Sequence, residues 1–135
     1  FFNFLIIGIP LGLLTTNILF INQFPDYKSD KLAGKNNLVV LLGKSLSRYV
    51  YFLILILSFI SMFFVKPILI ENIINFNLLA FYIILSLLFV FGLYIFYGLY
   101  KNYDNRDLIN SNIYTIHFQS IFSLFYILVL NNFFI

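Results

Sequence analysis

Four long apolar segments alternate with short polar stretches along the chain. Charged residues are absent from residues 1–24, 49–65, 72–100 and 108–135. A transmembrane helix needs about 20 mainly apolar residues, so the second segment is extended back into residues 45–48. The segments are continuously apolar, whereas membrane strands would alternate over about ten residues. We therefore predict an all-α polytopic bundle with four spans, at about residues 1–24, 46–65, 78–100 and 110–133.

Composition makes a lipid bilayer the expected solvent. Hydrophobic residues make up 62% of the 135 residues and charged residues only 10%, and the mean hydropathy is +1.00. Because a soluble domain is about 25% charged, we expect an integral, multi-pass membrane protein. The lack of cysteine excludes disulfides and thiol metal sites. The first segment lacks the basic leader of a signal peptide and begins with Phe1 rather than Met, so we expect a portion of a longer protein.

The basic residues predict the orientation of the spans. Seven of the eight lie in the first and third connections, which face the same side of the membrane. They are Lys28, Lys31, Lys35, Lys44, Arg48, Lys101 and Arg106, and the exception is Lys66. Because cytoplasmic loops carry an excess of Lys and Arg, we expect both connections on the cytoplasmic side. The net charge of +3 then reflects topology, and nucleic-acid binding is not indicated, since acids are interleaved and no soluble domain is expected.

The first connection carries the only chemically distinctive pattern. Asp26 and Asp30 are four residues apart, which on a helix places both carboxylates on one face, and Asn22 precedes them by another four. Like charges at this spacing repel by a few tenths of a kcal/mol. A hard cation such as Mg²⁺ would offset that repulsion, because it binds carboxylate oxygens together with water and phosphates. The alternative is a solvated charged loop in which neighbouring lysines compensate the acids.

Two further features of the spans have structural interpretations. Gly8 and Gly12 flank Pro10 in the first span, a spacing typical of close helix packing and a kink, although a kink could also shape a cavity. In the last span, polar His117 and Gln119 are costly in lipid and often functional. For His117 we expect an interhelical hydrogen bond, with acceptor binding or proton transfer as the alternative.

Residues 22–43 also resemble a known motif. The stretch contains Asn22-x-x-x-Asp26-x-x-x-Asp30, then Gly34-Lys35, and ends in Leu-Val-Val-Leu-Leu-Gly43. It is similar to the second Asp-rich motif of the UbiA superfamily of intramembrane aromatic prenyltransferases, and most similar to the 1,4-dihydroxy-2-naphthoate polyprenyltransferase branch. Two positions depart from the family pattern: Asn37 stands where Thr is usual, and Leu41 where Arg is common.

The resemblance implies a fold and an activity. It implies a bundle of about nine spans, of which these 135 residues are the C-terminal part and supply one of two Asp-rich loops. The implied reaction transfers a polyprenyl group from a polyprenyl diphosphate to an aromatic acceptor, 1,4-dihydroxy-2-naphthoate in menaquinone biosynthesis, at the bacterial inner membrane. Asp26 and Asp30 would then hold Mg²⁺ with help from Asn22, and Lys31 and Lys35 would contact the diphosphate or remain solvated. We expect the chain alone to be inactive.

Diphosphate departs only if its growing charge is neutralised, and the allylic cation left behind needs a dry cavity with aromatic walls. Wall candidates are Tyr94, Tyr97 and Tyr114, each of which could instead face lipid, and Tyr114 and His117 are candidates for acceptor binding. The third connection, residues 101–107, could close over the site or simply join two helices. The competing function is a non-enzymatic membrane protein, a transporter or assembly subunit, with an acidic cytoplasmic loop.

Overall fold

The computed structural model describes residues 2–70 and 77–131, and within them every regular element is a helix. Four helices are long and apolar enough to cross a membrane, and two short helices lie between the first two of them. The long helices are α1 (Phe2–Ile21), α4 (Lys44–Val65), α6 (Leu78–Asn102) and α7 (Leu108–Asn131). The short ones are α2 (Tyr27–Leu32) and α3 (Leu38–Leu42).

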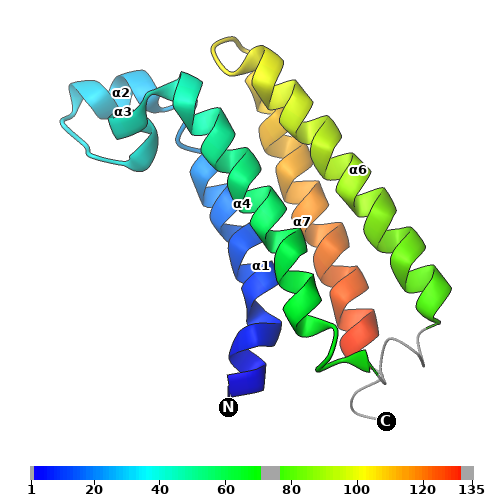
Figure 1. Ribbon diagram of the computed structural model, residues 1–135. Helices are drawn as coiled ribbons and strands as arrows, with labels where there is room; N and C mark the ends of the chain where they lie inside the picture. Colours follow the sequence, from blue (N-terminus) through cyan, green and yellow to red (C-terminus); the bar gives the residue numbers. More distant parts are fainter. Residues whose placement is uncertain (1, 71–76, 132–135) are drawn as a thin grey trace.

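The long helices form an antiparallel bundle in which α1 packs against α4 and α7, and α6 packs against the same two helices (Figure 1). The α1–α4 and α6–α7 connections therefore lie at the same end of the bundle, the upper end in Figure 1, with α2 and α3 at its margin. Aromatic side chains fill much of the interior: the ring of Phe59 lies 5.9 Å from that of Phe122 and 6.3 Å from that of Phe118. The connections that carry most of the charge are thus brought together.

The predicted spans are confirmed as helices, with small shifts at their ends. The observed helices begin or end within a few residues of each predicted boundary, and α4 begins at Lys44, ahead of the predicted start at residue 46. Asn77 caps α6 by accepting hydrogen bonds from the amides of Leu79 and Ala80, which explains why that helix starts at residue 78. The predicted ends at residues 1 and 132–133 lie outside the described residues.

A ladder of side-chain hydrogen bonds joins α7 to α1. Asn112 donates to the side-chain oxygen of Asn22 at 3.3 Å, and Gln119 donates to Thr15 at 3.2 Å. One further heptad along α7, the hydroxyl of Tyr126 donates to the backbone carbonyl of Ile7 at 2.8 Å. Because lipid offers no alternative partners, such bonds help to hold membrane helices together. The ladder therefore fixes α7 against α1 along most of their length.

The expected close packing at Gly8 and Gly12 is wrong for the described residues. A Cβ atom at either glycine would have no neighbour within 4 Å. The close approaches occur instead on α6, where a Cβ at Gly92 would lie 3.1 Å from Leu55 of α4, and one at Gly98 would lie 3.0 Å from Ser111 of α7. These two glycines let α6 pack closely against both neighbours.

Candidate functional site

The first connection, residues 22–43, is called the Asp-rich loop below. It folds into α2 and α3, which are separated by a turn at Gly34 and joined to α4 through Gly43. Both glycines have positive φ angles, 71° and 77°, a conformation that costs other residues roughly 1 kcal/mol or more. The two glycines therefore fold the loop back on itself at the end of the bundle.

Asp30 is the most firmly held group of the Asp-rich loop. It lies on α2 and is only 8% exposed. One carboxylate oxygen accepts from the ammonium of Lys35 at 2.7 Å, and the other accepts from the side-chain amide of Asn37 at 2.8 Å. A buried carboxylate must be paired or hydrogen-bonded to remain charged. Both of its oxygens have such partners, so its orientation is fixed.

Lys35 closes the turn that follows α2. Its ammonium binds the side chain of Asp30, and its backbone amide donates to the carbonyl of the same residue at 2.9 Å. The hydrogen bond to the Asp30 carboxylate raises the pKa of Lys35 above its usual 10.5, and the charges of Asp30 and Asp26 add to this. The lysine side chain is nevertheless 65% exposed. Its ammonium can therefore move to another anion without disturbing the packing.

Asn37 is the site residue that the sequence interpretation missed. Besides donating to Asp30, its side-chain oxygen accepts from the backbone amide of Val40 at 2.8 Å and so caps α3. An Asn immediately before an apolar run is a recognised sign of a helix start, so this capping was visible in the sequence. The departure from the Thr of the family pattern therefore keeps a side chain that can cap α3.

Asp26 contrasts with Asp30. It stands immediately before α2, and its backbone carbonyl accepts from the amide of Asp30 at 2.8 Å, so one helical turn separates the two residues. Its side chain is exposed and makes no hydrogen bond or ion pair with the described residues. Of the predicted pair, one carboxylate is thus anchored and the other is free.

The donor set of this turn fits Mg²⁺. Each oxygen of Asp30 accepts one hydrogen bond and keeps capacity for another partner, and the carboxylate of Asp26 is uncommitted. Mg²⁺ is commonly held by one or two carboxylates and takes water and phosphate oxygens as its other ligands. No group of three or more His, Cys, Asp or Glu residues occurs within residues 2–70 and 77–131. The described chain could therefore supply a two-carboxylate site but not a complete cage.

The other predicted ligands have partners of their own. The side-chain oxygen of Asn22, just beyond α1, accepts from Asn112 and so forms the first rung of the α1–α7 ladder. Lys31 is exposed, and its ammonium lies 5.7 Å from the centre of the Tyr27 ring. Asn22 is thus tied to the bundle, whereas Lys31 extends from the surface of α2.

The connection between α6 and α7, residues 103–107, packs beside the Asp-rich loop. Lys44 at the start of α4 binds Asp104 at 3.3 Å. Arg48, one turn further along α4, lies between two tyrosine rings, 4.2 Å from the centre of Tyr100 and 4.4 Å from that of Tyr103. It also donates to the backbone carbonyl of Tyr100 at 3.0 Å. These contacts tie the end of α6 to α4.

The aromatic candidates occupy the outer surface of α6 and α7. Tyr94 and Tyr114 lie 6.0 Å apart, between ring centres, and border a polar recess of about 150 Å³. Tyr97 is exposed and does not border that recess. His117 is exposed and makes no hydrogen bond with the described residues, so the expected interhelical bond is wrong. That bond is made by Gln119, whose side chain faces α1.

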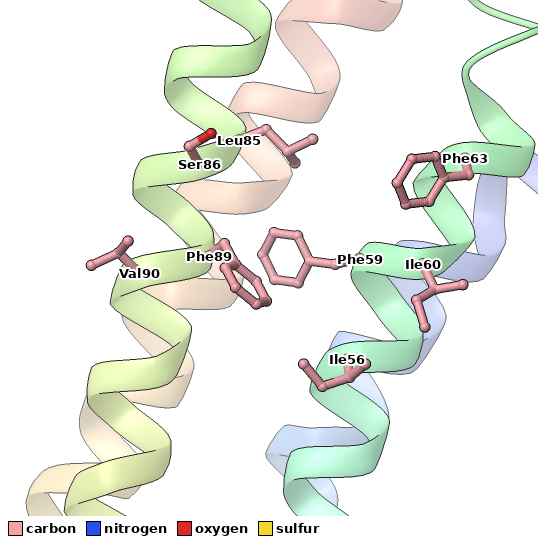
Figure 2. Close-up of a pocket in the computed structure, with 8 residues that line it drawn as sticks. All are labelled: Ile56, Phe59, Ile60, Phe63, Leu85, Ser86, Phe89 and Val90. Atoms are coloured by element: carbon pink, nitrogen blue, oxygen red, sulfur yellow. The ribbon is translucent and has the colours of Figure 1, made fainter.

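An apolar groove of about 440 Å³ lies between α4 and α6, away from the charged end (Figure 2). Phe59 and Phe89 point toward one another across it, with a ring-centre distance of 5.1 Å. Seven of its eight lining side chains are apolar, and the hydroxyl of the eighth, Ser86, donates to the backbone of its own helix. The groove therefore offers packing surface and no group that could act on a diphosphate.

Comparison with known proteins gives one match. The model of the UbiA prenyltransferase family matches residues 2–126, which include all of the Asp-rich loop, the three helices α1, α4 and α6, and most of α7. Neither the curated proteins nor the solved structures include a match to the chain.

Proposed function

Because the chain belongs to the UbiA prenyltransferase family, we propose that its Asp-rich loop binds the diphosphate of a polyprenyl donor through Mg²⁺. Membership itself implies prenyl transfer in a membrane. The finer proposal is that the acceptor is aromatic and is 1,4-dihydroxy-2-naphthoate, as the similarity of residues 22–43 to that branch suggests. The chain would then act in menaquinone biosynthesis, in the bacterial inner membrane with the loop on the cytoplasmic side.

The observation that carries this proposal is the state of the two carboxylates. The carboxylate of Asp30 is buried and oriented by two donors, whereas the carboxylate of Asp26, one turn away, is exposed and has no hydrogen-bond or ion-pair partner within the described residues. An anchored ligand beside a free one suits a cation that must bind and release with its substrate. The location at the end of a membrane bundle suits a donor whose tail is in lipid and whose head is in water.

We assign the following roles to this chain's residues. Asp26 and Asp30, with Asn22, would hold Mg²⁺, which when bound neutralises charge on the departing diphosphate. Lys35 would shift from Asp30 toward a phosphate oxygen, since its side chain is exposed, and Lys31 would supply a second positive charge. The remaining ligands would be water, phosphate oxygens and a second Asp-rich loop outside these 135 residues. Tyr94 and Tyr114 are proposed to present ring faces to the acceptor side, with His117 nearby on α7.

The proposal is tested with the full-length protein in membranes, supplied with Mg²⁺, labelled polyprenyl diphosphate and 1,4-dihydroxy-2-naphthoate. Asp26→Asn keeps the shape of the side chain and removes its charge, and we expect transfer to fall by about 100-fold or more because one ligand for the leaving-group cation is lost. The 135-residue chain alone is expected to give no product.

The matched control is Asp104→Asn, which removes one exposed carboxylate from the α6–α7 connection and should change transfer by less than about two-fold. Equal activity of the Asp26→Asn variant and the wild type would show that the metal role is wrong. Transfer to 4-hydroxybenzoate in place of 1,4-dihydroxy-2-naphthoate would show that the proposed acceptor is wrong, and would leave the proposed metal role unchanged.

A further inference from the structure

A second polar pocket lies at the charged end of the bundle. It has a volume of about 470 Å³ and is formed where the beginning of α2, the beginning of α4 and the α6–α7 connection meet. Its lining residues are Pro25, Lys28, Lys44, Asp104, Asn105, Arg106, Leu108 and Ile109. Three of these are basic and one is acidic, so the pocket carries an excess of positive charge.

The positive charge of this pocket is only partly compensated. The ammonium of Lys44 binds Asp104 at 3.3 Å, and its side chain is only 14% exposed. Lys28 and Arg106 make no ion pair or side-chain hydrogen bond within residues 2–70 and 77–131, and both are exposed. Two uncommitted cations therefore face one cavity, which is the arrangement that attracts an anion.

The pocket lies on the other side of α2 from the carboxylate of Asp30. Residues two apart on an α-helix point about 200° away from each other, so Lys28 and Asp30 extend from opposite sides of α2. An anion held by Lys28 is consequently separated from any metal ion held by the carboxylates. An anion in this pocket would therefore occupy a place separate from the proposed diphosphate site.

The pocket also has an apolar part, at the start of a helix that is long and apolar enough to cross a membrane. Leu108 and Ile109 line it and are the first residues of α7. Leu108 is buried, whereas Ile109 is 56% exposed and presents an apolar side chain beside the cations. A ligand with a phosphate head and an acyl tail would place its head among Lys28, Lys44 and Arg106 and its tail along Ile109.

We propose that this pocket binds the phosphate group of an anionic phospholipid headgroup. Basic pockets between transmembrane helices recognise such headgroups through charge and hydrogen bonds. The bound lipid would bridge α2 to the α6–α7 connection and hold the Asp-rich loop across the end of the bundle. Lipid binding in this pocket does not depend on prenyl transfer. A free phosphate has the same head chemistry, and the test below separates the two sources.

The test measures lipid-dependent thermal stability of the purified full-length protein in nonionic detergent, without Mg²⁺ or prenyl donor. Short-chain phosphatidylglycerol should raise the unfolding midpoint in a saturable way, which gives an apparent Kd. Each basic residue near a phosphate surface contributes about five-fold in affinity. The double variant with Lys28→Gln and Arg106→Gln should therefore bind phosphatidylglycerol about 25-fold more weakly.

The matched control is Lys101→Gln, which removes one exposed basic residue at the end of α6 that does not line the pocket. Its apparent Kd should stay within about two-fold of the wild-type value, and zwitterionic phosphatidylcholine should bind much more weakly. Unchanged affinity for phosphatidylglycerol in the double variant, or an equal loss in Lys101→Gln, would show that the lipid does not bind in this pocket. If inorganic phosphate or diphosphate bound more tightly than phosphatidylglycerol, and the double variant lost that binding, the ligand of the pocket would be a free phosphate and not a lipid.

Discussion

The Asp-rich loop and the α6–α7 connection lie at the same end of the bundle. Each has an aspartate that is bound by a lysine, but the two contacts differ in kind. In the Asp-rich loop, Asp30 is buried and both of its oxygens are bound, by groups five and seven residues away. Beside the connection, Asp104 is 74% exposed and accepts one longer bond, from Lys44 sixty residues away.

The difference in burial and partners indicates different roles for Asp30 and Asp104. A buried acid held by near neighbours in sequence sets the local conformation, so Asp30 organises the turn between α2 and α3. An exposed pair contributes little to stability, at most about 1 kcal/mol. It leaves Lys44 able to exchange its partner. The Asp-rich loop is therefore built around its carboxylate, whereas the pocket beside the connection is left positively charged.

The largest effect is expected from neutralising the buried acid. Asp30→Asn keeps the size of the side chain but removes its charge, both as the partner of Lys35 and as a proposed metal ligand. We expect prenyl transfer by the full-length protein to fall by about 10²–10³-fold. The change is measured as the initial rate with labelled donor in membranes.

The same assay on Asp104→Asn is the comparison from the α6–α7 connection, and the expected change is less than about two-fold. Gel filtration of the Asp30→Asn variant in detergent checks that the bundle remains folded. Similar losses in the two variants would show that the connections do not differ in the way proposed.

A smaller effect is expected from the cap of α3. Asn37→Ala removes the hydrogen bond to Val40 and one donor to Asp30, and loss of a cap costs about 1 kcal/mol. The amide of Val40 should therefore exchange with solvent about five-fold faster in native-state hydrogen exchange. Asn37→Thr should keep the wild-type rate, since Thr also caps helices.

The matched change in the α6–α7 connection is Asn105→Ala. Its side-chain amide donates to the side chain of Asn102 at 3.4 Å, in an exposed position, so exchange at Val40 should not change. If Asn37→Ala also left exchange at Val40 unchanged, the hydrogen bond from Asn37 would have no part in holding α3.

The spans could be predicted from the sequence because their cause is local. Runs without charge, such as residues 78–100, are long enough to cross a bilayer whatever they pack against. The Asp-rich loop was also recognisable, because Asp26 and Asp30 stand four residues apart in a charged interval between two uncharged spans, and the family match covers them.

Pairing between distant residues could not be predicted, because composition does not say which faces meet. The rungs of the α1–α7 ladder join residues 90 to 119 positions apart, so Gln119 could not be chosen over His117 as the bonding side chain. The close approaches of α6 at Gly92 and Gly98 likewise depend on packing, and the motif at Gly8 and Gly12 pointed elsewhere. Local patterns thus defined the elements, and tertiary contacts assigned the partners.

The smallest expected effect is a pH dependence, and it concerns Lys35, the partner of the buried acid. The pKa of Lys35 is raised above 10.5 by Asp30, so its ion pair stabilises the folded loop most fully below pH 10.5. This contribution is lost as the pH rises through the elevated pKa. Between pH 7 and 9 the ammonium stays charged, and the pH dependence of transfer in that range should not come from Lys35.

Carbon NMR of protein with labelled lysine side chains measures this titration directly. The resonance of Lys35, assigned by its loss in Lys35→Gln, should have a midpoint above 10.5. In Asp30→Asn the midpoint should return toward 10.5, because the hydrogen bond to a charged carboxylate is the largest cause of the shift. In Asp107→Asn it should not move, since that carboxylate lies in the other connection. An unshifted midpoint in the wild type would mean that the pair between Lys35 and Asp30 is not formed in solution, and the buried acid would then need another partner.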